Sequence, residues 1–128
     1  MTKCPCGTAK TYADCCELIH RNIHNAKTAE DLMRSRYTAF VLANGVYLMK
    51  SHHSTTRPVH EKEEIVAWAK SVQWIRLEVL GTTKGGSNDK KGTVHFKAYF
   101  FEGGIVQTIE EHSLFEREEE HWVYVGAM

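Results

Sequence analysis

The residues best suited to bind a metal are the cysteines, and all four lie within the first sixteen residues, as Cys4, Cys6, Cys15 and Cys16. The first two belong to a Cys-Pro-Cys-Gly turn, in which proline fixes one backbone angle and glycine permits a positive φ, so both sulfurs can point to one place. The second two are adjacent and can reach that place where the backbone bends, as at a helix start, whose dipole favours thiolates. This pattern predicts one structural zinc ion in a closed tetrahedral site, with Zn–S distances of about 2.3 Å.

Other interpretations of these cysteines stay open. Disulfides or four unrelated thiols are the simplest, but the chain opens without the apolar run of a secretory signal. We therefore expect a reducing cytoplasm, where a dense cysteine cluster favours metal binding. His20 or His24 could be the fourth ligand in place of Cys16. A second metal site at the His52-His53 doublet lacks a third ligand at suitable spacing.

A second set of polar residues could form a pocket in the rest of the chain. Arg36 lies one turn before Phe40 on a predicted helix and is expected to point inward, whereas Arg34, two positions away, faces elsewhere. Glu111 shares a strand face with the apolar Ile109, which draws the carboxylate into the interior. Because a buried carboxylate without a partner costs several kcal/mol, we expect Arg36 to pair with it.

Together with His53, these two residues would form a polar cluster that binds or transforms a small molecule, with Tyr37 or Trp74 as a wall. Histidine transfers protons near neutral pH, and a desolvated carboxylate can act as a base. The alternative is a structural pair of Arg36 and Glu111 that ties a helix to the sheet, with His53 as a loop residue.

The hydrophobic spacing predicts helices in the first part of the chain. Thr28, with Asp31 three residues later, resembles a capping box and opens a helix over residues 29–43, which Asn44-Gly45 closes. A short helix is expected over residues 47–51. A third helix, over residues 59–71, carries its apolar residues on one side.

After residue 71 the hydrophobic period changes to two, which is typical of strands. We expect strands over residues 74–80, 93–101, 105–116 and 121–125, with a mobile glycine-rich connection over 81–92. In the first strand, Ile75, Leu77 and Val79 should share one face. Trp68, Trp74 and Trp122 are expected to be packing residues of the core or its edge.

The length and charge narrow the class of protein. The chain has 128 residues, with sixteen basic and sixteen acidic side chains, which argues against a general nucleic-acid binder. It has no apolar run of about 18 residues, so we expect no membrane span. A chain of this length can bury one modest hydrophobic core. We therefore expect a single domain over residues 27–128, with the knuckle over residues 1–26 as an appendage. Helices followed by an antiparallel meander predict an α+β fold, with helices packed on a curved sheet.

The first segment, CPCGTAKTYADCC, resembles the SEC-C motif, a short zinc module. The residues that match are Cys4, Pro5, Cys6, Gly7, Lys10, Tyr12, Cys15 and Cys16. Thr8 and Ala9 replace the serine and glycine that are usual in the motif.

The rest of the chain also resembles a known family. The order of elements is similar to the nuclear transport factor 2-like fold, a cone in which a bent sheet and helices enclose a pocket. The stretches LMRSRYTAF, YLMKSHH, TVHFKAYF and EEHSLFEREEEHWVYVGA resemble the bacterial YchJ-like family, which combines this fold with a SEC-C motif.

Two functional classes follow. SEC-C knuckles are associated with docking on proteins and ribosomes, so the resemblance implies an adaptor whose knuckle docks on a protein or ribonucleoprotein partner. The alternative is a hydrolase or isomerase that acts on a small molecule in the polar pocket. The exposed sheet would also support a homodimer.

The sequence contains no motif that matches a nucleotide-binding loop or a nucleophile elbow. Basic residues exceed acidic ones over the first 28 residues, with Lys3, Lys10, Arg21 and Lys27 against Asp14 and Glu17.

Overall fold

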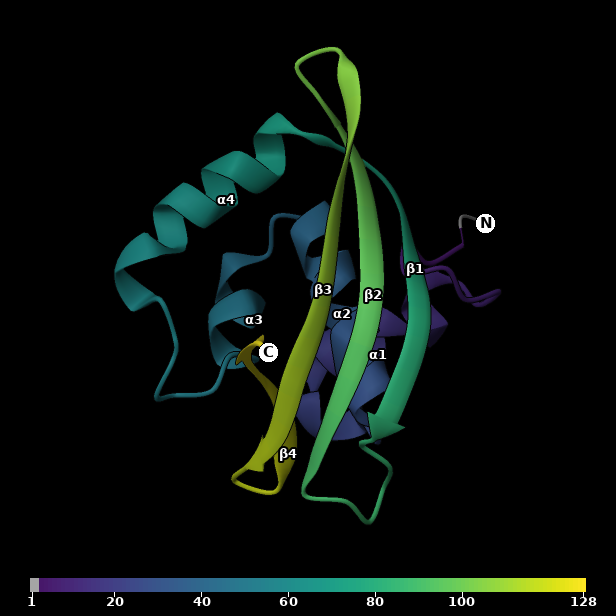
Figure 1. Ribbon diagram of the computed structural model, residues 1–128, viewed down its shortest axis with the longest axis vertical. Coiled ribbons are helices and arrows are strands. Elements are labelled where there is room, and N and C mark those ends of the chain that lie inside the picture. The colour runs from purple at the N-terminus through teal and green to yellow at the C-terminus, as the bar shows by residue number, and fades with distance from the viewer. Residues whose placement is uncertain (1–2) are drawn as a thin grey trace.

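The computed structural model describes residues 3–128 as helices packed against one curved antiparallel sheet (Figure 1). The helices are α1 (Cys16–Arg21), α2 (Ala29–Val41), α3 (Gly45–Lys50) and α4 (Lys62–Ser71), joined by short 3-10 turns at Tyr12–Asp14, Ile23–Asn25 and Val59–Glu61. The strands are β1 (Gln73–Lys84), β2 (Lys91–Glu102), β3 (Ile105–Glu118) and β4 (His121–Ala127), and they pair in sequence order. The predicted α+β fold is therefore confirmed.

The long strands β1 to β3 bend around α2, and α4 lies farther out, next to α3 (Figure 1). Among residues 3–128, no helix combines the length and the apolar character that crossing a bilayer requires. The main core lies between α2 and the inner face of the sheet. Its largest fully buried side chains are Trp122, Phe115, Leu32, Leu48 and Val94.

Helix α2 positions both of the candidate sites. Its N-cap Thr28 accepts a hydrogen bond from the Asp31 amide at 3.0 Å, and the Asp31 carboxylate accepts one from the Lys27 amide at 3.1 Å. The predicted cap is thus present, with the return bond one residue earlier than in a standard capping box. Eight of the thirteen residues of α2 are buried, because the helix is covered by the cysteine knuckle on one side and by the sheet on another.

The helix after α2 begins earlier than predicted. The sequence predicts that Asn44-Gly45 closes α2, but α2 ends at Val41 and Asn44 is the N-cap of α3, where it accepts a hydrogen bond from the Tyr47 amide at 3.1 Å. Asparagine serves both as an N-cap and after a helix end, so sequence alone does not separate the two roles. Gly45 is required by packing, since a Cβ there would lie 2.6 Å from a methyl group of Val66 in α4.

Strand β1 departs from simple alternation. Trp74 pairs with Phe100 and Arg76 pairs with Tyr99, so Ile75 is the extra residue of a β-bulge. A bulge shifts the phase of the side chains by one residue. The prediction that Ile75 shares a face with Leu77 and Val79 was therefore wrong: Ile75 is 49% exposed, and Trp74 contributes to the interior in its place.

The predicted mobile connection over residues 81–92 is shorter in the structure, because β1 extends to Lys84 and β2 begins at Lys91. Gly85 has a φ of +79°, and a Cβ added to Gly92 would lie 2.3 Å from the Gly85 Cα. The Ala29 amide donates a hydrogen bond to the Gly85 carbonyl at 2.9 Å. The turn is therefore held against the start of α2.

We predict that Gly92→Ala lowers the free energy of unfolding by about 2–3 kcal/mol, because the new methyl group must push two backbones apart. Gly81→Ala is the matched control, since a Cβ at Gly81 meets nothing within 4 Å, and its effect should stay within about 0.5 kcal/mol. Denaturant unfolding of both variants measures the difference. Equal losses in the two variants would contradict the close approach at Gly92.

Candidate metal centre and cavity

The four cysteine sulfurs converge, with every Sγ within 4.8 Å of the others. Sγ of Cys15 lies 3.6 Å from Sγ of Cys6 and 4.0 Å from Sγ of Cys16. These separations are far longer than a disulfide bond of about 2.05 Å. Sulfurs about 2.3 Å from a tetrahedral ion are about 3.8 Å apart, so the cluster has the spacing of a thiolate metal centre.

The backbone holds the sulfurs as the sequence predicts. The Gly7 amide donates to the Cys4 carbonyl at 3.2 Å, and the Cys4 amide donates to the Lys10 carbonyl at 2.8 Å. Gly7 takes a φ of +97°, a conformation that glycine adopts without a steric penalty. Helix α1 begins at Cys16, with Cys15 as its N-cap residue, so the two adjacent sulfurs diverge from one bend.

Residues of α2 complete the surroundings of the cysteines. The Thr38 hydroxyl donates to Sγ of Cys16 at 3.3 Å and lies 3.7 Å from Sγ of Cys4. Nη1 of Arg34 donates to the Cys6 carbonyl at 2.6 Å. A hydrogen bond from the Cys16 thiol, assisted by Thr8, lowers the pKa of Cys6 to about 4. The same hydrogen bond and burial raise the pKa of Cys16, and burial raises that of Cys15, so these contacts favour the thiolate at Cys6. The contacts of Thr38 and Arg34 join the knuckle to the domain.

The two histidines considered as ligands lie outside the cluster. In His20, Nε2 lies 2.8 Å from the Ser35 carbonyl and Nδ1 lies 2.8 Å from the Tyr12 hydroxyl. Both ring nitrogens are thus hydrogen-bonded, and burial lowers the pKa of His20, so the ring is a neutral bridge between the knuckle and α2. His24 is exposed and hydrogen-bonds Asn22.

The knuckle segment is not an appendage. Ile19, Ile23 and Ala26 belong to the same buried core as the residues of α2 and the sheet. Cys4, Cys6 and Cys16 are themselves buried. The first 26 residues therefore share a core with the rest of the chain, and the predicted boundary after residue 26 stays a prediction.

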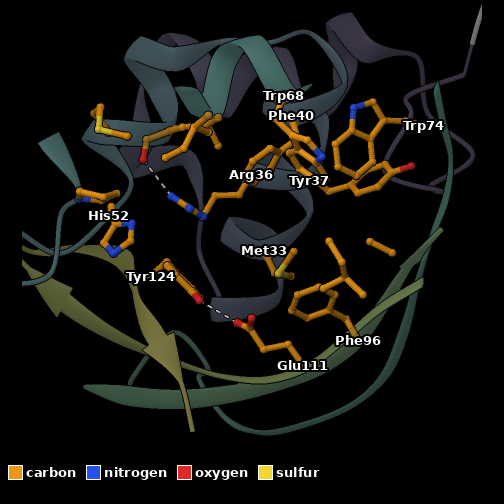
Figure 2. Close-up of a pocket in the computed structure, with 16 residues that line it drawn as sticks. Met33, Arg36, Tyr37, Phe40, His52, Trp68, Trp74, Phe96, Glu111 and Tyr124 are labelled. Carbon is orange, nitrogen blue, oxygen red and sulfur yellow. Dashed lines mark hydrogen bonds between the residues drawn. The ribbon is translucent and has the colours of Figure 1, made fainter. Parts of the chain in front are cut away.

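A cavity of about 330 Å³ lies between α2, α3, α4 and the inner face of the sheet (Figure 2). Most of its wall is apolar. The aromatic residues that line it are Tyr37, Phe40, Trp68, Trp74 and Phe96, and the polar ones are Arg36, His52, Glu111 and Tyr124. The expected walls, Tyr37 and Trp74, are thus part of the lining.

The polar end of the cavity is organised around Arg36, whose side chain is predicted to point inward and does so. It is 7% exposed, and its Nη1 donates to the Leu48 carbonyl at 2.9 Å and to the Ser51 hydroxyl at 2.7 Å. Its guanidinium carbon lies 4.6 Å from the centre of the Tyr124 ring. Burial lowers the pKa of Arg36 to about 10, which leaves the side chain positively charged at neutral pH.

Glu111 is in the cavity wall, but it does not form the predicted ion pair with Arg36. Its Oε2 accepts a hydrogen bond from the Tyr124 hydroxyl at 2.7 Å and another from the Ser113 hydroxyl. Figure 2 shows Tyr124 between the two charged residues. Arg36 therefore packs against the ring of Tyr124, and the carboxylate of Glu111 accepts a hydrogen bond from the Tyr124 hydroxyl. Tyr124, which the sequence analysis did not predict, thus lies between the two charged groups.

The histidine at this end is His52, whereas His53 was predicted. His53 lies outside the lining, where its Nδ1 is 2.9 Å from the Thr55 hydroxyl and 3.6 Å from a Glu118 carboxylate oxygen. The backbone explains the exchange: the His53 amide donates to the Tyr124 carbonyl at 2.7 Å, and the Tyr124 amide donates to the Ser51 carbonyl at 2.8 Å. This pairing with β4 turns His52 inward and His53 outward.

The apolar end is an aromatic cluster. The Trp74 ring centre lies 5.4 Å from that of Trp68, 5.8 Å from that of Phe40 and 5.7 Å from that of Tyr37. The Trp68 and Trp74 rings are nearly perpendicular, at 89°, which is a favourable edge-to-face geometry. Trp74 is held in place because its Nε1 donates to the Ala69 carbonyl at 3.2 Å.

The fold and the cysteine knuckle define the class of protein. Residues 2–18 match the SEC-C motif, and residues 28–127 match the model described as the YchJ, middle NTF2-like domain. The chain belongs to the YchJ family of SEC-C proteins with a nuclear transport factor 2-like domain.

Relatives and solved structures agree with this assignment. A UPF0225 protein from Vibrio parahaemolyticus is 40% identical over 97% of this chain and 73% of its own length, and one from Streptomyces avermitilis is 43% identical over 95% and 81%. The solution structure of a SEC-C motif containing protein from Rhodopseudomonas palustris has 31% identity and a TM-score of 0.88 over 99% of this chain and 98% of its own. A crystal structure of such a protein from Psychrobacter arcticus has 31% identity and a TM-score of 0.81, over 98% and 82%.

We predict that Thr38→Val weakens binding of Zn²⁺ by about 10- to 100-fold, because the variant loses the hydroxyl that contacts two cysteine sulfurs. Thr38→Ser keeps the hydroxyl and should bind within about threefold of the wild type. Competition with a chelator measures both affinities. Equal affinities in the valine and serine variants would show that the hydroxyl does not support the centre.

A second prediction concerns His52, whose pKa is lowered to about 4, mainly by burial. The unfolded chain binds this proton near pH 6.5, so stability should fall as pH decreases from 6.5 to 4, by up to about 3 kcal/mol. His52→Gln should remove this part of the pH dependence. Urea unfolding of both proteins at several pH values measures the difference, and parallel pH profiles would contradict burial of a neutral His52. His20 contributes equally to both profiles.

Proposed function

We propose that this protein binds a small, largely apolar molecule in the cavity, and that one zinc ion in the cysteine knuckle is structural. The observation that carries the proposal is the buried Arg36 at one end of an aromatic-lined cavity. Ligand sites are typically hollows of about 300–1,000 Å³ with few, well-placed polar groups in an apolar wall. A cavity of about 330 Å³ with polar groups gathered at one end matches this description.

The donors of Arg36 support binding as the role of the cavity. Nη1 makes two hydrogen bonds, whereas Nε and Nη2 have no hydrogen-bond partner among residues 3–128. Neither atom is among the buried side-chain polar atoms without a partner in this part of the chain, so both reach space that water can enter. A ligand head group in the cavity can replace that water and accept from these donors, which favours a ligand.

The zinc ion would serve the fold. Four thiolates complete a tetrahedral shell, which leaves no open position for substrate or for an activated water. The ion would hold Cys4, Cys6, Cys15 and Cys16 against Thr38 of α2. Helix α2 also carries Arg36 and Tyr37 into the cavity, so a stable knuckle would help to keep the cavity walls in place.

The other functions predicted from the sequence stay predictions. Docking on a protein or ribonucleoprotein would use the outer surface of the knuckle, where Lys3, Lys10, Arg21 and Lys27 are exposed. A hydrolase or isomerase would use the same polar end of the cavity, with Glu111 as the base. We favour binding because Arg36, Tyr124 and the aromatic cluster serve recognition whether or not a reaction follows.

The test is a fragment screen by NMR, detected on the side-chain N–H signals of Trp68 and Trp74. Ala98→Leu should weaken binding by about tenfold or more, because Ala98 lines the cavity and the larger side chain fills it. Ala67→Leu, at an exposed position of α4, is the matched control and should bind like the wild type. A screen without binders, or binders that Ala98→Leu does not affect, would refute the proposal.

A further inference from the structure

The polar end of the cavity contains one positive and one negative group, arranged around a single ring. Arg36 stacks on the Tyr124 ring, with 4.6 Å from its guanidinium carbon to the ring centre. Glu111 accepts hydrogen bonds from the Tyr124 and Ser113 hydroxyls, which is the pattern of an ionised carboxylate. Burial, together with the nearby Glu111, raises the pKa of Tyr124, so its hydroxyl stays protonated and donates. The two charges cancel.

His52 adds no third charge to this end. Its ring packs edge-on against Tyr124, with 5.0 Å between ring centres. Burial and the neighbouring Arg36 and Arg57 lower the pKa of His52 to about 4. The neutral ring offers one donor and one acceptor nitrogen.

The polar end has both a hydrogen-bond donor and a hydrogen-bond acceptor available for a ligand. Nε and Nη2 of Arg36 are donors without partners among residues 3–128, and Oε1 of Glu111 is an acceptor without a partner in the same part of the chain. All of these residues line the cavity. A bound molecule can therefore satisfy a donor and an acceptor at once.

From this balance we infer that the cavity selects an uncharged aromatic molecule whose polar head carries both a hydrogen-bond acceptor and an N–H donor, as in an amide or a lactam. This inference rests on the proposed binding function. An anionic head that pairs with Arg36 would leave Glu111 without a counter-charge, and a cationic head that pairs with Glu111 would leave Arg36 without one. Either head would add an uncompensated charge to this end of the cavity, which is unfavourable.

The other end of the cavity defines the body of the ligand. The nearly perpendicular Trp68 and Trp74 rings and the Phe40 ring offer faces and edges to a flat aromatic group. The volume of about 330 Å³ corresponds to about eleven water molecules at roughly 30 Å³ each. A bicyclic ring with a short polar arm is of suitable size.

The experiment compares three probes with the same ring and different heads: indole-3-acetamide, which is neutral, indole-3-acetate, which is an anion, and tryptamine, which is a cation at pH 7. Isothermal titration calorimetry gives their dissociation constants for the wild-type protein. The amide should bind about tenfold or more tightly than either charged probe.

Glu111→Gln keeps the shape of the side chain and removes its charge, which leaves Arg36 without a counterion. In this variant the affinity for indole-3-acetate, relative to that for indole-3-acetamide, should rise about tenfold. Glu110→Gln is the matched control, because Glu110 is the residue before Glu111 on β3, is exposed and hydrogen-bonds His95 on the other face of the sheet. That variant should bind the three probes in the same order of affinity as the wild-type protein.

The outcomes separate this inference from the proposed function. Acetate or tryptamine binding as tightly as the amide, or a Glu111→Gln variant with the wild-type order of probes, would overturn the inference while binding in the cavity stands. Failure of all three probes, with other fragments bound at Trp68 and Trp74, would also overturn it. The absence of any fragment that Ala98→Leu displaces refutes the proposed function itself.

Discussion

The burial of one guanidinium group is the constraint on which the rest of the structure depends. A charge that leaves water needs hydrogen-bond partners, and Arg36 is held by groups from separate elements. Its Nη1 binds the Leu48 carbonyl of α3 and the Ser51 hydroxyl after it, and its face is covered by Tyr124 of β4. Loss of any of these contacts would leave a buried charge beside apolar side chains with one partner fewer. The contacts therefore hold the helices and the sheet in one arrangement.

Helix α2 transmits this constraint to the other end of the molecule. Thr38 contacts two cysteine sulfurs, Arg34 holds the Cys6 carbonyl, and the neighbouring Arg36 and Tyr37 line the cavity. A residue such as His20, which bridges the knuckle to the Ser35 carbonyl, belongs to neither site alone. The cysteine cluster and the cavity therefore lie against different faces of one helix.

The likeness to other SEC-C proteins concerns the fold, whereas the proposed binding function rests on the cavity. A nuclear transport factor 2-like cone can hold many kinds of ligand, because a fold provides a scaffold and the side chains in it provide the chemistry. In this chain the lining balances one positive and one negative group: Arg36 and Glu111 lie on either side of Tyr124, next to a neutral His52. In the proposed function, that arrangement, more than the size of the cavity, would limit what can bind.

The sequence by itself determined the convergence of the four cysteines, the order of helices and strands, the α2 cap at Thr28 and the inward direction of Arg36, because each depends on residues close along the chain. Only the tertiary structure decided that Ile75 bulges outward, that His52 enters the cavity in place of His53, and that Tyr124 separates Arg36 from Glu111. Those outcomes depend on which backbones pair: residues 51–53 hydrogen-bond to β4, and the β1 bulge is set by its register with β2. Pairing between segments far apart in the chain leaves no local signal, because either face of a strand or loop can turn inward until its partner is present.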